Sequence, residues 1–291
     1  MVTLSIIVLS YNTKDLILNC LSGVVKQYAN QLETRKFEII VLDNNSHDDS
    51  VKTIKKEFAG TNYLKLIENK ENLGFGKGCN LGAKNSNGKY ILFLNSDTEV
   101  LDKGFLSMAE FLEKNPKVGI LGGKLENNDG SIQFSAGKFY NLFNLIIMLL
   151  GLERLGFLRS SPNKIEKVDW VSGACMMVAR SVFEKLKGFD GNFFMYMEDM
   201  EICFRASKLG LATYFFPSIR LKHKSMGSSN RTFAIINIYQ GILHFYSKHK
   251  SHSQFVVVKL LLKIKAAFGI FVGAIFGNSS LVKTYKSAME I

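Results

Sequence analysis

The chain has 291 residues, which is long enough for one large α/β domain and an appendage. Hydrophobic residues make up 47% of it and only three residues are proline, a composition that excludes a disordered polypeptide. The formal net charge of +12 favours an anionic partner: a nucleic acid, an anionic lipid or a phosphorylated substrate.

Strands and helices are predicted to alternate through the first hundred residues. An unbroken apolar run at 4–9 is typical of a strand buried on both faces, and apolar residues at helical spacing follow it. The pattern repeats, with strands at 4–9, 37–42, 63–68 and 90–94 and helices at 15–28, 51–58 and from the glycine-rich stretch 72–78 to about residue 88. This alternation predicts a parallel sheet with helices on both faces and ligands beyond the carboxyl ends of its strands.

The alternation becomes irregular after residue 100. The sequence there predicts helices at 105–114, 180–186 and 198–209, a strand at 118–124, and apolar segments at 139–158 and 170–179. It shows no internal repeat and no low-complexity linker. The simplest division is one α/β domain, residues 1–230, followed by a C-terminal helical extension, residues 231–291.

Cysteine usage and the N-terminus predict the compartment. The four cysteines are scattered without a CxxC pair, so we expect them to be reduced and half-buried rather than a zinc cluster or a disulfide framework. The first twelve residues carry no basic segment before their apolar run, which favours a strand over a signal peptide. Together these features predict a cytoplasmic protein.

Two residues are candidate metal ligands. Asp97 directly follows the strand predicted at 90–94, where a carboxylate suits a divalent metal that binds a diphosphate; a turn or capping role is the alternative. His223 follows another expected strand and precedes a stretch rich in Gly and Ser. A lone histidine is more often structural, but neutral imidazole also binds Mn²⁺-like metals. The presence of each residue therefore favours a metal-binding role for the other.

Three carboxylates begin the helix predicted at 198–209. We interpret Glu201 as the partner of Arg205 in a surface pair four residues apart. Glu198 and Asp199 follow the aromatic run at 193–196, so one of them is expected to lie in a pocket and to act as a general base toward a hydroxyl.

The glycine-rich stretch 72–80 begins a helix, so its backbone N–H groups could face an anion. It lacks the GK[ST] ending of a P-loop. It also follows the third strand instead of the first, which argues against a dinucleotide-binding fingerprint.

Seven segments in order resemble family 2 glycosyltransferases with the GT-A fold, a Rossmann-like and mostly parallel sheet flanked by helices. The resemblance covers roughly residues 3–230 and is greatest to a bacterial rhamnosyltransferase-like branch that builds surface polysaccharide. The segments are SIIVLSYN, VLDNNSHDDS, NLGFGKGCNLG, LFLNSDTEV, WVSGACMMVAR, GFDGNFFMYMEDMEICFRASKLG and LKHKSMGS.

The resemblance implies a role for each matching residue. Asp97 and His223 would hold Mg²⁺ or Mn²⁺, with Asn95 in place of the first Asp of the family's DxD motif, and Asp199 would be the catalytic base beside Glu198. Trp170 and Gly173 would shape the acceptor pocket. The nucleotide and donor would contact Ser10, Tyr11, Asn12, Asp43, Asn44, Asn72, Gly74, Phe75, Asn80, Asn95 and Ser96.

The implied activity is inverting transfer of a sugar from a nucleotide-diphosphate donor to a hydroxyl of a glycan or polyprenyl-linked acceptor. The rhamnosyltransferase-like branch implies dTDP-rhamnose as the donor, with a UDP-hexose or UDP-galactofuranose as alternatives. A non-catalytic nucleotide-sugar binding protein is an alternative of another class. No aromatic-interleaved basic surface or nucleic-acid motif is present, so we expect no nucleic-acid partner.

The apolar tail at 254–277 raises the question of a membrane. Its 24 residues approach the length that crosses a bilayer, but Lys259, Lys263 and Lys265 interrupt it. An amphipathic helix lying on the inner face of the plasma membrane fits this pattern better. A core helix or one that packs in a homo-oligomer is the alternative. The apolar segment 139–158 is expected either to contribute to the same surface or to cover a lipid-linked acceptor.

Overall fold

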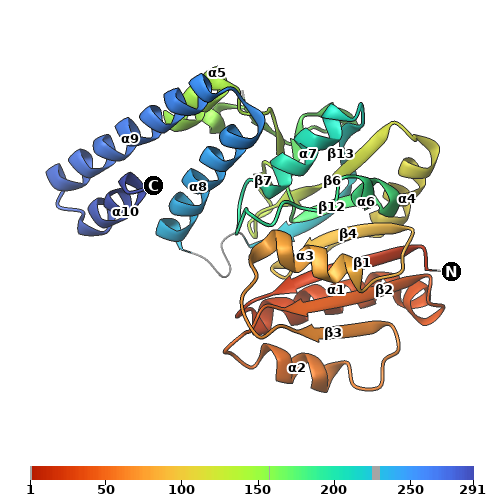
Figure 1. The fold of residues 1–291 in the computed structure, drawn as a ribbon. Helices are drawn as coiled ribbons and strands as arrows, with labels where there is room; N and C mark the ends of the chain where they lie inside the picture. Colours follow the sequence, from red (N-terminus) through yellow and green to blue (C-terminus); the bar gives the residue numbers. More distant parts are fainter. Residues whose placement is uncertain (1, 157, 225–229) are drawn as a thin grey trace.

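The computed structural model of the chain describes residues 2–156, 158–224 and 230–291 (Figure 1). The strands are β1 (Leu4–Ser10), β2 (Phe37–Asp43), β3 (Leu64–Glu68), β4 (Tyr90–Asn95), β5 (Thr98–Val100), β6 (Val118–Glu126), β7 (Ile132–Gln133), β8 (Ala136–Gly137), β9 (Arg159–Ser160), β10 (Glu166–Val168), β11 (Trp170–Val171), β12 (Cys175–Ala179) and β13 (Ala212–His223). The helices are α1 (Lys14–Glu33), α2 (Ser50–Glu57), α3 (Gly74–Lys84), α4 (Gly104–Lys114), α5 (Leu142–Leu149), the 3₁₀ helix η1 (Leu152–Leu155), α6 (Arg180–Lys185), α7 (Glu198–Lys208), α8 (Arg231–His249), α9 (His252–Ile275) and α10 (Ser279–Met289).

The main sheet has the order β10-β13-β6-β12-β4-β1-β2-β3. Strands β3, β2, β1 and β4 are parallel neighbours, as are β6 and β13, so the mostly parallel sheet is confirmed. Strand β12 lies between β4 and β6 and runs antiparallel to both, which the sequence did not predict. A second, three-stranded sheet has the order β11-β8-β9.

Both faces of the main sheet are buried. Ile6 and Val8 of β1 lie in the core under α1 and α4, whereas Ile7 lies in the opposite core under α3, because successive side chains of a strand point to opposite faces. The rings of Tyr28 and Phe105 stack at 5.0 Å in the first of these cores. The predicted helices on both faces are therefore confirmed.

The predicted boundaries need small corrections. Helix α1 continues to Glu33 instead of 28, and α3 ends at Lys84 instead of near 88. All four cysteines are free, as expected, but they are fully buried instead of half-buried. Burial raises the pKa of the Cys20 thiol to about 12, which keeps that thiol protonated.

Strand β13 changes partners along its length. Its pairing with β6 shifts in register between Phe216 and Arg220, around Pro217, which has no N–H to donate to a ladder. Beyond this irregularity its last residues also pair antiparallel with β5, with His223 opposite Thr98. Because β5 follows β4 closely in the chain, this pairing brings the end of β13 near the end of β4.

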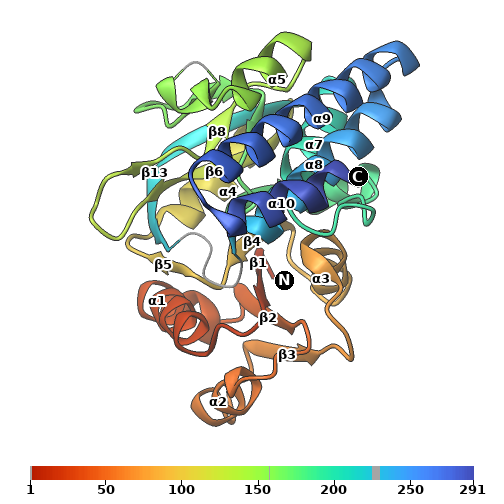
Figure 2. The ribbon, with the colours of Figure 1, turned by 90° about the vertical axis from the view of Figure 1, so that its left-hand side faces the viewer.

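Three helices, α8, α9 and α10, follow the sheet and pack on one another and on α5 (Figures 1 and 2). Helix α8 joins this group to α7, since the rings of Phe245 and Phe204 lie 5.1 Å apart with Phe245 fully buried. The division at residue 230 remains a prediction. Within the described part of the chain, no helix has both the length and the apolar character needed to cross a membrane.

Glu201 corrects one expectation. Its carboxylate does pair with Arg205, at 2.8 Å, but the side chain is completely buried instead of lying on the surface. It also accepts from Lys248 at 2.8 Å and lies 2.9 Å from His249 Nε2, both on α8. One buried acidic side chain thus links α7 to α8 through two basic partners, Lys248 and His249.

We predict that Glu201→Gln lowers the free energy of unfolding by about 3 kcal/mol, because it leaves the largely buried guanidinium of Arg205 without its counter-charge. The measurement is urea denaturation. The matched control is Glu68→Gln, which breaks an exposed pair with Lys55 and should cost under about 1 kcal/mol. Equal effects of the two substitutions would contradict the role of the buried network.

Candidate functional site

The loops that follow β1 and β2 are locked together at the carboxyl edge of the sheet. The N–H of Asn12 donates to Ser46 Oγ at 2.9 Å, and the N–H of His47 donates to Asn12 Oδ1 at 2.8 Å. The N–H of Asn44 donates to the carbonyl of Ser10 at 2.8 Å. Asn12 is held in the left-handed region with φ of 52°, which asparagine tolerates better than most residues. The two loops therefore form one surface beyond the strand ends.

The predicted nucleotide-binding residues of these loops have different roles. Asp43 is buried, and its carboxylate accepts from Ser46 through N–H at 2.8 Å and Oγ–H at 2.6 Å. The amide of Asn44 donates to the carbonyl of Gly74 at 3.1 Å and accepts from Asn69, so it holds the start of α3. Ser10 is buried, with its hydroxyl 3.1 Å from that of Thr13, whereas Tyr11 is half-buried.

The start of α3 lies against the loop that precedes α7. The N–H of Phe75 donates to the carbonyl of Phe194 at 2.7 Å, and Asn72 Oδ1 accepts from the N–H of Gly74 at 2.9 Å. Gly74 has φ of +75°, and a Cβ there would lie 2.3 Å from Phe194 O. Only glycine fits this close approach.

Asn80 differs from its expected role. Its Nδ2 donates to the carbonyl of Phe189 at 2.8 Å and its Oδ1 accepts from the N–H of the same residue at 2.9 Å. Both ends of the amide are thus occupied by backbone, and we assign Asn80 to holding the loop after α6 instead of to the donor pocket.

Asp97 and His223 come together at the ends of β4 and β13. Asp97 Oδ1 lies 3.2 Å from His223 Nε2, and both side chains are largely buried. The pairing of Thr98 with His223, and a hydrogen bond of 3.0 Å from Lys224 N to Asp97 O, set this register. The matching segment LKHKSMGS continues into residues 225–228, which lie outside the described residues.

Gln133, which the sequence did not single out, orients the imidazole. Its Nε2 donates to Asn127 Oδ1 at 2.9 Å, so its Oε1 faces His223 Nδ1 at 2.5 Å. Nδ1 must then carry a proton, because a carbonyl oxygen only accepts. The other ring nitrogen, Nε2, is consequently the one directed at Asp97. Nothing in the sequence pattern marks Gln133, since it lies in the two-residue strand β7.

This pair fits a cation. A neutral imidazole would direct the lone pair of Nε2 at a carboxylate oxygen, which is favourable only with a proton or a metal ion between them. Asn95 Nδ2 lies 3.3 Å from His223 Nε2. Ser96, between Asn95 and Asp97 in the chain, is buried. Within the described residues no cluster of three His, Cys, Asp or Glu side chains could hold a metal.

Asp199 lies at the N-terminus of α7, held by backbone groups. Its Oδ2 accepts from the N–H of Gly173 at 3.1 Å and its Oδ1 from the N–H of Met200 at 2.8 Å. The two residues before the helix, Tyr196 and Met197, both have positive φ, of 68° and 74°. Such backbone costs roughly 1–3 kcal/mol per residue and is typical of functional sites.

Glu198 and Asp199 are adjacent buried carboxyl groups, but different surroundings shift their pKa values. Burial raises the pKa of Glu198 well above its usual value, and the neighbouring charge of Asp199 raises it further; its Oε2 is buried without a hydrogen-bond partner. Burial also raises the pKa of Asp199, but two backbone N–H groups and the positive charge of Arg159 oppose the rise. The pKa of Glu198 is therefore raised further than that of Asp199, so Glu198 keeps its proton more readily than Asp199 does.

A short segment of backbone joins the two centres. The N–H of Asn95 donates to the carbonyl of Ala174 at 3.1 Å. The N–H of Gly173, the residue before Ala174, donates to Asp199. A Cβ at Gly173 would lie 3.1 Å from the ring of Phe75. Residues 173–174 therefore contact the end of β4 through Asn95, the carboxylate of Asp199, and the start of α3 through Phe75.

Trp170 lies three residues before Gly173 and is held in place by a hydrogen bond. It is buried, and its Nε1 donates to the carbonyl of Lys138 at 3.1 Å. The guanidinium of Arg159 lies 5.7 Å from the centre of the Trp170 ring, and its Nε is 3.2 Å from Glu153 Oε2. Arg159 was not predicted, because its strand β9 has two residues and follows an irregular apolar segment.

Comparison with known proteins points to one family. Residues 5–187 match the sequence profile of glycosyl transferase family 2. Rhamnosyltransferase WbbL of Escherichia coli (strain K12) is 28% identical over 239 residues, which cover 78% of this chain and 85% of that protein. The N-acetylglucosaminyl-diphospho-decaprenol L-rhamnosyltransferase of Mycobacterium tuberculosis is 25% identical over 222 residues, covering 68% of this chain and 69% of that protein.

Two solved structures share the fold. GalNAc-T7, crystallised with UDP, GalNAc and Mn²⁺, aligns over 84% of this chain and 50% of its own with a TM-score of 0.62 and 16% identity. The mannosyltransferase PcManGT from Pyrobaculum calidifontis, in complex with GDP-Man and Mn²⁺, aligns over 98% of this chain and 73% of its own with a TM-score of 0.59 and 16% identity. These similarities confirm the GT-A fold.

We predict that Gln133→Leu weakens Mn²⁺ binding about tenfold, because His223 loses the acceptor that fixes its tautomer. The measurement is an electron paramagnetic resonance titration of Mn²⁺ in the presence of a nucleoside diphosphate. Gln133→Glu, which keeps an acceptor for Nδ1–H, is the control and should retain the affinity. Wild-type Mn²⁺ binding by Gln133→Leu would remove Gln133 from the site.

Proposed function

Because the chain belongs to glycosyl transferase family 2, we propose that it transfers a sugar from a nucleoside-diphosphate donor to a hydroxyl of a glycan or lipid-linked acceptor with inversion at the anomeric carbon. One observation carries this proposal: Asp199 accepts from the N–H of Gly173, and the next residue, Ala174, accepts from the N–H of Asn95, two residues before the Asp97 that lies 3.2 Å from His223. A transfer of this kind needs a site for the diphosphate and a base for the hydroxyl next to each other.

The loops after β1 and β2 would receive the nucleoside, with the half-buried Tyr11 at their surface and the buried Asp43 holding Ser46 in place. Asp97 and His223 would hold the divalent cation, Mg²⁺ or Mn²⁺, which supplies Lewis-acid stabilisation of the charge on the departing diphosphate. The partly exposed amide of Asn95 lies beside this pair and can donate to a diphosphate oxygen.

Asp199 would take the proton. The acceptor oxygen forms a bond to the anomeric carbon as its O–H proton passes to the Asp199 carboxylate; the bond from that carbon to the diphosphate oxygen breaks, and its electron pair leaves with the nucleoside diphosphate. Burial raises the pKa of Asp199, which makes it a stronger base than an exposed aspartate. A single displacement with one base inverts the anomeric configuration.

Glu198 would act through Asp199 without touching substrate. As a neutral carboxyl it fills the space beneath the base without adding a second negative charge. The positive charge of Arg159 opposes the rise in the pKa of Asp199 and so favours the ionised base. The same cation can attract a negatively charged acceptor, such as the phosphate of a lipid-linked sugar.

The proposed donor is dTDP-rhamnose, with UDP-hexose and UDP-galactofuranose as alternatives. Two relatives with rhamnosyltransferase names support rhamnose, and one of those names includes a diphospho-decaprenol acceptor. A product of this type would serve bacterial surface polysaccharide. We place the reaction at the cytoplasmic face of the plasma membrane, with residues 231–291 as the membrane-associating extension.

We predict that Asp199→Asn lowers turnover at least about a hundredfold while donor binding is kept, because the amide cannot take the proton. Glu198→Gln should keep turnover within about threefold, because Glu198 is already neutral and the amide has the same shape. The measurement is nucleoside diphosphate released from dTDP-rhamnose and, in parallel, from UDP-hexoses.

This pair of variants separates the alternatives. Near-normal turnover by Asp199→Asn would remove it as the base, and equal losses in both variants would show that the pair acts as one unit. A wild-type protein that binds a nucleotide sugar, as judged by its melting temperature, without releasing product would be the non-catalytic binder instead.

We predict that Arg159→Gln moves the acid limb of kcat to higher pH. Asp199 must be ionised to act, and loss of the neighbouring cation favours its protonated form, so its pKa rises and activity is lost at a higher pH. Arg159→Lys keeps the charge and is the control. An unchanged pH profile for Arg159→Gln would exclude an electrostatic role for Arg159.

A further inference from the structure

The exposed apolar side chains of this protein are concentrated on one surface. Among the described residues, eighteen large apolar side chains are exposed, and thirteen of them lie on α5, η1 and α9 or directly after these helices. We call this set the apolar face: Phe143, Ile146, Leu150, Leu152, Leu155, Val256, Val257, Leu260, Ile264, Phe268, Phe271, Ile275 and Phe276. A concentration of this kind marks an interaction surface.

The two parts of the apolar face adjoin. Helices α5 and α9 are in contact, and both views place them together on the side of the molecule opposite α2 and β3 (Figures 1 and 2). Phe143 of α5 is 71% exposed and Leu260 of α9 is 60% exposed, whereas Leu145 and Leu262 point into the core. Each helix therefore keeps one apolar side for the protein and presents another outward.

Helix α9 is apolar on two opposite sides. At 3.6 residues per turn, its buried residues Val258, Leu262 and Ala266 lie on one side and the exposed Leu260, Ile264 and its later aromatic residues on the other. A helix that only completed a core would need a single apolar side. The outer side therefore requires a partner of its own.

Lysines border the outer side of α9. By helical position, Lys259 and Lys263 follow one edge of the exposed stripe and Lys265 the other, with the ammonium of Lys265 5.9 Å from the ring centre of Phe268. Residues 231–291 contain eight lysines and arginines against a single acidic residue, Glu290. An apolar stripe between basic edges matches the boundary between acyl chains and anionic headgroups.

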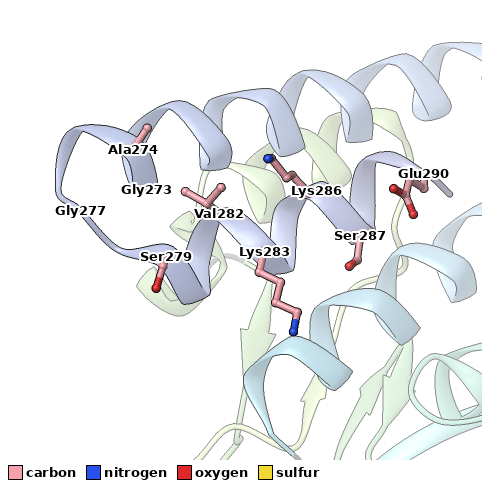
Figure 3. Close-up of a pocket in the computed structure, with 9 residues that line it drawn as sticks. All are labelled: Gly273, Ala274, Gly277, Ser279, Val282, Lys283, Lys286, Ser287 and Glu290. Carbon is pink, nitrogen blue, oxygen red and sulfur yellow. The ribbon is translucent and has the colours of Figure 1, made fainter.

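A hollow of about 550 Å³ continues this basic surface at the far end of α9 (Figure 3). Lys283 and Lys286 of α10 line it together with Ser279, Ser287 and Glu290, and Figure 3 shows the two lysines directed away from each other. They do not converge on one ligand, so we assign the hollow no small molecule. Its lysines add positive charge next to the apolar face.

We propose that the apolar face docks the protein on an anionic lipid bilayer, with α9 and the α5–η1 segment lying in the interface. The α5–η1 segment connects β8 to β9, which carries Arg159 beside Asp199. Docking through this segment turns the acceptor side of the site toward the lipid. In this respect the inference rests on the proposed function, because a lipid-linked acceptor would then reach Asp199 from the bilayer.

A second copy of the chain fits this surface less well. A symmetric dimer through the exposed stripe of α9 would bring the lysine edges of the two copies together, and like charges at an interface repel. Anionic headgroups complement the same edges. The charge pattern therefore favours a membrane as the occupant.

The test is sedimentation of the full chain with vesicles of equal parts phosphatidylglycerol and phosphatidylcholine, and with pure phosphatidylcholine vesicles. We expect the Phe268→Ser, Phe271→Ser double variant to bind the mixed vesicles at least about tenfold more weakly, since two exposed aromatic side chains no longer enter the lipid. The matched control is Ile165→Ser with Leu209→Ser, two exposed apolar residues outside the face, which should change binding less than about twofold.

Charge is tested separately. Lys259→Gln with Lys263→Gln should lower binding to the mixed vesicles about tenfold and leave the weaker binding to phosphatidylcholine unchanged. Wild-type protein that binds neither vesicle would overturn the proposal. So would a wild-type dimer in sedimentation equilibrium that the Phe268→Ser, Phe271→Ser variant makes monomeric.

Activity distinguishes this inference from the proposed function. Phe143→Ser with Leu150→Ser should slow transfer to a lipid-linked acceptor in vesicles, while donor turnover with a soluble acceptor stays at the wild-type level. Equal rates with both acceptors would contradict the orientation toward the bilayer. Vesicle binding without any sugar transfer would leave the docking surface standing and reject the proposed function.

Discussion

The short ladder between β5 and β13 is the constraint on which the candidate site depends. Asp97 precedes β5 directly, and the antiparallel register sets His223, at the end of β13, opposite Thr98. Strand β13 pairs with β6 along one edge, and its other edge pairs with β10 before Pro217 and with β5 after it. Two side chains separated by more than a hundred residues of sequence are thereby held 3.2 Å apart by backbone hydrogen bonds.

Backbone groups also hold the second centre. The carboxylate of Asp199 is fixed by two N–H groups, and the left-handed conformations of Tyr196 and Met197 turn the chain so that α7 begins beneath it. Gly173 and Ala174 directly precede the antiparallel strand β12. Because β12 pairs with β4, these two residues contact both Asn95 and Asp199. A rigid frame of this kind suits chemistry in which positions matter more than flexible side-chain contacts.

The C-terminal helices are joined to this frame through charge. Glu201 lies two residues after Asp199 on α7, and its buried carboxylate binds Lys248 and His249 of α8. Helix α8 packs in turn on α9, whose outer side is apolar. The same helix that carries the proposed base is therefore tied to the proposed membrane surface by one buried ion network and continuous packing.

The sequence by itself determined the alternating strands and helices, the order of the matching segments and the candidates Asp97, Asp199 and His223, because hydrophobic period and residue type are local properties. It could not reveal β12 in the middle of the sheet, the burial of Glu201, or Gln133 and Arg159, which lie in two-residue strands without a periodic pattern. Nor could it show that Asn80 holds a loop and that Trp170 supports an arginine. Those outcomes depend on which distant segments pack together, and only the tertiary structure decides that.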